Sequence, residues 1–294
     1  MAETLHVVDR ETCTGDGICA EVCPKQALEV VDEMVTTVQD RAGLCISCGQ
    51  CVAVCPTEAL HMPTLPDGSY YRLEKPGFGY GELLHFLQSR RSVRAFKDKP
   101  VPREVIEKIL EAAATAPMGV PPHSTQVVVI DRREELDLLL ATMVADYDVL
   151  LRGFGSPVGR VVIRLGHGAE VFNQLDNHVI DIARRNNEAY RADGSDRYMY
   201  HAPVLMLFHA SRWAMSYEEN AHLVCHHAML AALALGLGST IIGLVPPIVD
   251  RSKELRRRYE IPEDNRVLTS LILGYPKYRY RRGITRELAG VRYH

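Results

Sequence analysis

The chain has 294 residues, which suits about two domains of roughly 100–200 residues each. Hydrophobic residues make up 47% and charged residues 24%, and the formal net charge of -3 gives no reason to expect nucleic acid or an anionic membrane as a partner. No apolar run reaches the roughly 18 residues that a membrane-spanning helix needs, and the N-terminus lacks the basic stretch and apolar core of a secretory signal. We therefore expect a cytoplasmic protein.

The cysteines are distributed very unevenly along the chain. Seven of the eight lie between Cys13 and Cys55, and Cys225 stands alone far downstream. Without an export signal, thiols crowded in this way bind metal more often than they form disulfides.

Residues 13–24 and 45–56 form an internal repeat, because each cysteine of the second copy matches a position 32 residues earlier. The second copy reads C-x2-C-x2-C-x3-C-P, and residues 5–62 resemble the bacterial two-cluster ferredoxins, in which the fourth cysteine ligates the other copy's cluster. Zinc knuckles also use C-x2-C. Their ligands come as two separated pairs, however, so the pattern favours iron–sulfur clusters.

This resemblance implies two ligand sets that cross between the copies. One set is Cys45, Cys48, Cys51 and Cys23, and the other is Cys13, Cys19 and Cys55 with Asp16 as possible fourth ligand. Asp16 stands where the second copy has Cys48, and a carboxylate holds soft iron less firmly than a thiolate does. The second set therefore predicts either a [4Fe–4S] cluster with Asp16 as ligand or a [3Fe–4S] cluster, with Asp16 only capping the loop as the remaining alternative.

The domain prediction is a ferredoxin domain over residues 1–65, a linker rich in Pro, Gly and Tyr over 66–81, and a second domain over 82–294. In the second domain the apolar periodicity predicts helices at 82–96, 101–116, 168–192 and 218–238. Short apolar runs predict strands at 125–131, 201–210 and 266–276. Helices alternating with a few strands imply an α+β fold.

Four pieces of the second domain occur in the same order as in the nitroreductase family. They are Arg90–Phe96, the Ala116–Pro117 turn, the Ala-rich helix that runs into Gly236–Ser239, and Leu273–Pro276 followed by arginines. Residues 83–294 thus resemble this family, which implies an FMN-binding α+β fold built as an intertwined homodimer, with flavin at the dimer interface.

The resemblance also implies the residues that bind FMN. Guanidinium groups grip phosphate oxygens bidentately, so the basic runs are the expected phosphate site. The implied residues are Arg90, Arg91, Ser92, Arg94, Arg279, Arg281 and Arg282 at the phosphate, Ile242, Gly243 and Leu244 along the isoalloxazine ring, and Pro117, Met118 and Gly119 from the other subunit.

Other polar residues receive no role from the sequence. Residues 145–200 are long for the family and include Arg152, His167 and Asp176, which we leave unassigned. Cys225 lies inside the Ala-rich helix, where its neighbours His226 and His227 face other directions, so we expect a core residue. No catalytic residue is predicted.

Together the two resemblances predict an FMN-dependent oxidoreductase that takes electrons through two iron–sulfur clusters and reduces a small organic acceptor. Nitroaromatics, quinones and activated alkenes are the acceptor classes that the family suggests, with a ferredoxin or NAD(P)H as donor. The alternative is an electron-transfer flavoprotein module that passes electrons to or from a partner protein.

Overall fold

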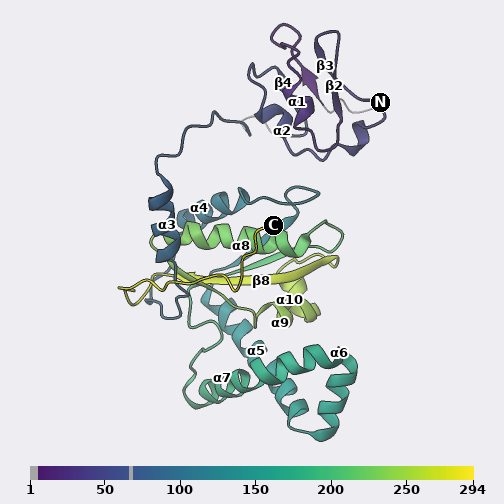
Figure 1. Cartoon of the computed structure of the whole chain (residues 1–294). Coiled ribbons are helices and arrows are strands. Elements are labelled where there is room, and N and C mark those ends of the chain that lie inside the picture. The colour runs from purple at the N-terminus through teal and green to yellow at the C-terminus, as the bar shows by residue number, and fades with distance from the viewer. Residues whose placement is uncertain (1–5, 66–68) are drawn as a thin grey trace. The chain divides into compact units, whose positions relative to one another are not determined.

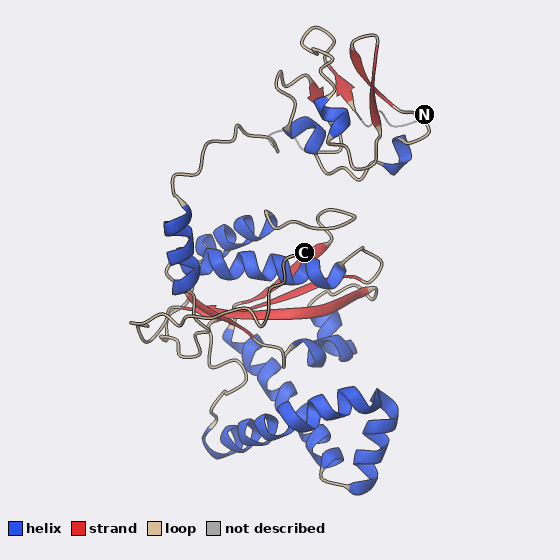
Figure 2. Cartoon of the chain, in the orientation of Figure 1, coloured by secondary structure: helices blue, strands red, loops and turns tan. Residues whose placement is uncertain are grey.

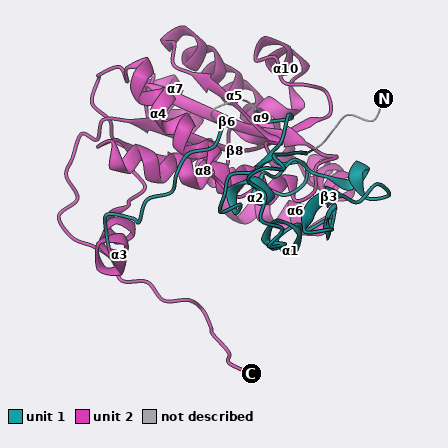
Figure 3. Ribbon diagram, turned by 90° about the horizontal axis from the view of Figure 1, so that it is seen from above, with its two compact units in different colours: residues 1–78, 119–122 teal, residues 79–118, 123–294 magenta. Residues whose placement is uncertain are grey.

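The computed structural model describes residues 6–65 and 69–294 (Figures 1 and 2). The chain divides into two compact units, residues 1–78 with 119–122 as unit 1 and residues 79–118 with 123–294 as unit 2 (Figure 3). Each unit has its own apolar core. Within the described residues, no helix is both long and apolar enough to cross a membrane.

Unit 1 shows the internal repeat as repeated structure. Its elements are β1 (Val7–Val8), α1 (Ile18–Glu21), β2 (Leu28–Val31), β3 (Met34–Thr37), the 3-10 helix η1 (Ala42–Leu44), α2 (Gln50–Ala53) and β4 (Leu60–His61). Strands β1 and β4 pair, as do β2 and β3. Helices α1 and α2 each begin after a left-handed glycine, Gly17 (φ 76°) and Gly49 (φ 72°), a conformation that a side chain would strain. The two loops therefore turn alike and bury Cys19 and Cys51 at matching positions.

Unit 2 is built on a four-stranded antiparallel sheet in the order β5-β6-β8-β7. The strands are β5 (Thr125–Ile130), β6 (Val204–Ser211), β7 (Gly238–Ile241) and β8 (Asn265–Gly274). Residues 204–210 of β6 are buried without interruption, because helices cover both faces of the sheet. This explains why the strand reads as a continuous apolar run rather than an alternating one.

The helices of unit 2 are α3 (Tyr80–Ser89), α4 (Arg103–Ala114), α5 (Arg133–Phe154), α6 (Pro157–His178), α7 (Ile180–Asp193), α8 (Tyr217–Ala234), α9 (Pro246–Arg251) and α10 (Lys253–Arg258). Helices α4 and α8 lie on one face of the sheet and α9 and α10 on the other (Figure 1). Small side chains let α8 pack closely, since Ala221, Ala228 and Ala232 are all fully buried. Helix α5 continues away from the sheet and packs with α6 and α7.

The helices and strands of unit 2 depart from the sequence prediction in several places, and helices α5, α9 and α10 were not predicted. The first helix ends at Ser89, so the basic run from Arg90 is extended rather than helical. The single helix predicted over 168–192 is two helices, because α6 kinks at Gly168 (φ 84°) and ends at His178 before α7 begins. The Ala-rich helix ends at Ala234, before its predicted end, and a turn through Gly236 (φ 77°) leads into the short strand β7.

Candidate functional site

The first candidate site is a hollow in unit 1 lined by Cys45, Cys48, Cys51 and Cys23. The first three come from one loop that runs into α2, and Cys23 comes from the other copy of the repeat. These are the four residues that the cross-ligation pattern groups into one set. Four thiols around one hollow suit a cuboidal iron–sulfur cluster.

The second candidate site is a separate hollow lined by Cys13, Cys19, Cys55 and Asp16. Three thiols and one carboxylate surround it, and Cys55 is the residue contributed by the second copy. The structure therefore brings together both predicted ligand sets, each around its own hollow.

Asp16 is engaged within its own loop by both carboxylate oxygens. The backbone N–H of Ile18 donates to Oδ1 at 3.0 Å, and the Thr14 hydroxyl donates to Oδ2 at 2.9 Å. Asp16 thus accepts the N–H of the first residue of α1 while it lines the second hollow. A carboxylate has further lone pairs, so these hydrogen bonds leave iron ligation chemically open.

The arrangement of donors in unit 1 differs from that of a single-ion site. In residues 6–65 and 69–294, no three or more His, Cys, Asp or Glu side chains are arranged to hold one metal ion. The ligands of a cuboidal cluster bind different iron atoms, so they are spread over the wall of a hollow. The cysteines form no disulfides within the described residues.

The third candidate site begins with the extended segment that follows α3. Ser92 pairs with Ser239 of β7 in a parallel bridge, and the Val93 N–H donates to the Ser239 carbonyl at 3.0 Å. Farther along, Phe96 pairs with Pro276, just after β8. Two basic runs that are far apart in sequence are thereby held next to each other.

A hollow between these runs is lined by Arg90, Arg91 and Arg279, together with Tyr278 and Tyr280. Burial lowers the pKa of Arg90, and the nearby charges of Arg286 and Arg91 lower it further. Among the ion pairs of the described residues, none involves the three arginines that line the hollow. Repelling guanidinium groups without an acidic partner suit an anionic ligand such as a phosphate.

The remaining residues predicted for the phosphate lie elsewhere. The Arg94 guanidinium lies over the Tyr200 ring, 6.0 Å from its centroid. The carbonyl of Arg282 accepts from Arg91 at 3.4 Å, and the carbonyl of Ser92 accepts from the Tyr280 hydroxyl at 3.5 Å. Arg94, Arg281 and Arg282 do not line the hollow.

The turn Ile242–Leu244 is fixed on both sides of its glycine. The Ile242 N–H donates to the Ser270 carbonyl at 3.0 Å, and the Tyr147 hydroxyl donates to the Leu244 carbonyl at 2.8 Å. Gly243 between them is exposed, with no atom within 4 Å of where a Cβ would stand. The turn therefore offers a rigid, open backbone surface on which a planar ring could lie.

The Pro117–Gly119 turn follows α4. Pro117 is exposed, and Met118 packs partly against the core beneath α4 and α8. Gly119 falls in unit 1 and the two residues before it fall in unit 2.

The structure shows an ion pair for Asp176 and a core position for Cys225, two residues that the sequence analysis singled out. Asp176 forms a bidentate ion pair with Arg160, at 3.0 and 2.6 Å, and the Arg160 guanidinium also lies over the Phe172 ring. Cys225 is fully buried, which raises its pKa to about 12. The prediction that Cys225 is a core residue is therefore confirmed.

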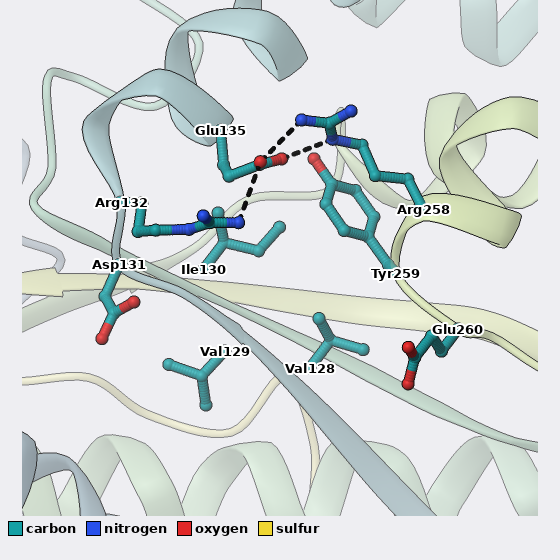
Figure 4. A pocket seen from close by; sticks show the side chains of 9 residues that line it. All are labelled: Val128, Val129, Ile130, Asp131, Arg132, Glu135, Arg258, Tyr259 and Glu260. Atoms are coloured by element: carbon teal, nitrogen blue, oxygen red, sulfur yellow. Dashed lines mark hydrogen bonds and ion pairs between the residues drawn. The ribbon is translucent and has the colours of Figure 1, made fainter.

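Sequence reasoning did not anticipate a hollow beside β5, which Figure 4 shows. Glu135 accepts two hydrogen bonds from Arg258, both at 2.6 Å, and one from Arg132 at 3.1 Å. The Tyr259 hydroxyl beside them is buried without a hydrogen-bond partner. The Glu135 carboxylate is shared by two guanidinium groups, and its ion pair with Arg258 ties α5 to α10.

Comparison with known proteins identifies the same two parts. A model of the nitroreductase family matches residues 87–275, and a model of the 4Fe-4S dicluster domain matches residues 12–60. A protein of Methanothermobacter thermautotrophicus with the provisional name NADH dehydrogenase/NAD(P)H nitroreductase is 26% identical over 195 residues, which is 66% of this chain and 78% of that protein. An Archaeoglobus fulgidus protein of the same provisional name is 26% identical over 196 residues, covering 67% of this chain and 86% of that protein.

Solved structures share the fold. The FMN-bound nitroreductase of Bacteroides fragilis superposes with a TM-score of 0.55 at 21% identity, over 72% of this chain and 97% of that one. The FMN-bound nitroreductase of Desulfitobacterium hafniense gives 0.50 at 20% identity, with the same coverage of 72% and 97%. The chain therefore belongs to the nitroreductase family and carries a 4Fe–4S dicluster ferredoxin domain ahead of its nitroreductase domain.

Proposed function

We propose that this protein is an FMN-dependent oxidoreductase that takes electrons through two iron–sulfur clusters and reduces a small organic acceptor. The observation that carries the proposal is the grouping of donors in unit 1. Each predicted ligand set lines its own hollow, in a chain whose other unit has the nitroreductase fold. Such thiols need a reducing setting, which favours the cytoplasm.

In this proposal unit 1 binds the two clusters and unit 2 binds FMN. Cys45, Cys48, Cys51 and Cys23 hold one [4Fe–4S] cluster, while Cys13, Cys19 and Cys55 hold the other with Asp16 as fourth ligand or as loop cap. Clusters supply single electrons and FMN can hold one or two, so together they can deliver a pair as a hydride equivalent.

In the flavin unit we assign Arg90, Arg91 and Arg279 to the FMN phosphate, because their guanidinium groups line one hollow without an acidic partner there. The exposed backbone at Gly243 lies against the isoalloxazine ring. Binding of FMN by the two solved relatives named above supports this choice of flavin.

We further propose a homodimer in which Pro117, Met118 and Gly119 complete the partner's flavin site. Exposed apolar side chains that a second copy would cover support this: Leu83 and Leu87 on α3 are 40% and 41% exposed, and Leu223 on α8 is 38% exposed. A soluble chain gains by covering such side chains.

The provisional names of the two relatives favour NAD(P)H as a direct donor to the flavin. A reduced ferredoxin is the donor from which the clusters would accept electrons. Nitroaromatics, quinones and activated alkenes are the acceptor classes to test.

The test combines cofactor analysis with donor-specific turnover under anaerobic conditions. Purified protein is assayed for iron, acid-labile sulfide and FMN, then for acceptor reduction with reduced ferredoxin or NAD(P)H. Cys48→Ser should abolish ferredoxin-driven reduction and retain NAD(P)H-driven reduction. Stoichiometric zinc without sulfide would overturn the cluster assignment. If the protein reduces a partner protein but none of the small acceptors, the result would favour the electron-transfer module.

A further inference from the structure

Leu65 and Tyr70 follow the second copy of the repeat and pack on its cluster loop. A Cβ built on Gly49 would stand 3.2 Å from Leu65 Cδ1, and 3.6 and 3.7 Å from Tyr70 Oη and Cε1. Gly49 is the residue after Cys48 and the start of α2. Both side chains therefore lie directly over the loop that presents Cys45, Cys48 and Cys51.

The first copy of the repeat has a different cover. At Gly17, which matches Gly49, a built Cβ would stand 3.4 Å from Val30 Cγ2 and within 4 Å of no other described atom outside its chain neighbours. Val30 belongs to β2, inside the repeat, whereas Leu65 and Tyr70 come after it. The two cluster loops are thus covered by segments of different origin.

Tyr70 is also set apart from its neighbours by its burial. It is 37% exposed, whereas Tyr71 is 78% and Leu73 81% exposed. In a stretch that the sequence predicts as a plain linker, one aromatic side chain is turned toward the cluster loop.

We propose that Tyr70 shields the loop of the cluster on Cys45, Cys48, Cys51 and Cys23 from water, whereas Val30 covers the matching loop of the other cluster. The inference rests on the ligand sets proposed above. Solvent exposure and the surroundings of the sulfur atoms set cluster potentials. Because water stabilises the more negative reduced form, covering the two cluster loops with different side chains lets the chain keep its two clusters at different potentials.

The test measures how fast each cysteine becomes free for alkylation as the clusters are lost from the full-length holoprotein. Protein is treated anaerobically with ferricyanide and a chelator, quenched at intervals and alkylated, and mass spectrometry then reports which cysteines have become free. In Tyr70→Ala, the set Cys45, Cys48, Cys51 and Cys23 should be alkylated several-fold sooner than in the wild type, with Cys13 and Cys19 unchanged. Tyr70→Phe keeps the ring and should behave like the wild type, as should the exposed control Tyr71→Ala.

An EPR redox titration supplies a second readout. The midpoint potential of one cluster should rise in Tyr70→Ala and not in Tyr71→Ala. If Tyr70→Ala and Tyr71→Ala release cysteines alike, or if both cysteine sets are released faster together, Tyr70 is not a selective shield. Tyr70→Val replaces Tyr70→Ala if the latter does not assemble both clusters, with the same outcomes expected.

The wild-type experiment tests the ligand sets separately. Release of Cys23 together with Cys13 and Cys19, instead of with Cys45, would overturn the cross-ligation whatever the Tyr70 variants do.

Discussion

Gly238 is the position where a single methyl group should disturb the proposed flavin site without removing any charge. A Cβ built there would stand 2.6, 2.7 and 2.8 Å from Cγ2, Cβ and Cγ1 of Val93. Val93 is only 6% exposed, and its N–H pairs with Ser239, so it has little room to move away. In Gly238→Ala the extended segment 90–96 must therefore shift from β7, carrying Arg90 and Arg91 away from Arg279.

The size of the effect follows from the packing. Adding a methyl group to a well-packed site costs about 1–3 kcal/mol. If FMN binding has to restore the displaced segment, this strain appears in the affinity, and about 1.4 kcal/mol corresponds to a tenfold change. We expect the dissociation constant for FMN to rise by roughly 5- to 150-fold.

Fluorescence titration of the flavin-free protein with FMN measures this constant. Gly81→Ala is the matched control, because the same methyl group on α3 would meet no atom within 4 Å. It should bind FMN like the wild type. Wild-type affinity in a folded Gly238→Ala protein would refute the argument that the Val93 contact holds the basic runs together.

Three further predictions address other parts of the molecule. Arg90→Ala should weaken FMN binding by about 1.5–3 kcal/mol, the scale of a hydrogen bond to a charged group. Arg94→Ala should have a smaller effect, because Arg94 does not line the basic hollow. Equal losses of affinity in FMN titrations of the two variants would contradict this difference. Asp16→Cys should fix its cluster as four-iron, and an unchanged EPR spectrum would show that Asp16 is remote from the iron. Burial lowers the pKa of His209 from 6.5 to about 4, so its contribution to stability is present above pH 6.5 and is lost as the pH falls toward 4. Urea unfolding should show the free energy of unfolding falling by about 3 kcal/mol over this pH range, and by less in His209→Gln. If the free energy of unfolding depends on pH identically in both proteins, the prediction is refuted.

The grouping of the cysteines around two hollows could be predicted from the sequence because its determinants are local. Two-residue spacings place three cysteines in one loop, and the resemblance to two-cluster ferredoxins identifies the cysteine that crosses over. The structure adds what spacing does not show, namely that both oxygens of Asp16 already accept hydrogen bonds within the loop.

The sequence identified the two basic runs, but not which of their arginines line a common hollow. Periodicity continued the first helix into Arg90–Phe96, whereas pairing with β7 and Pro276 makes this segment extended. Which arginines meet then depends on partners that are distant in the chain. For the same reason, the four-residue strand β7 and the kink at Gly168 escaped a reading based on local periodicity.

The contact between the Tyr280 hydroxyl and the Ser92 carbonyl spans 188 residues of chain, and it has a consequence for synthesis on the ribosome. The repeat of unit 1 closes when β4 pairs with β1, at His61. The basic hollow needs Arg279, which is translated far later. At about 5–20 residues per second the interval is on the order of 10 to 40 seconds. With the cofactor sites proposed above, the nascent chain would present its cysteine loops for metal loading well before it could retain a flavin.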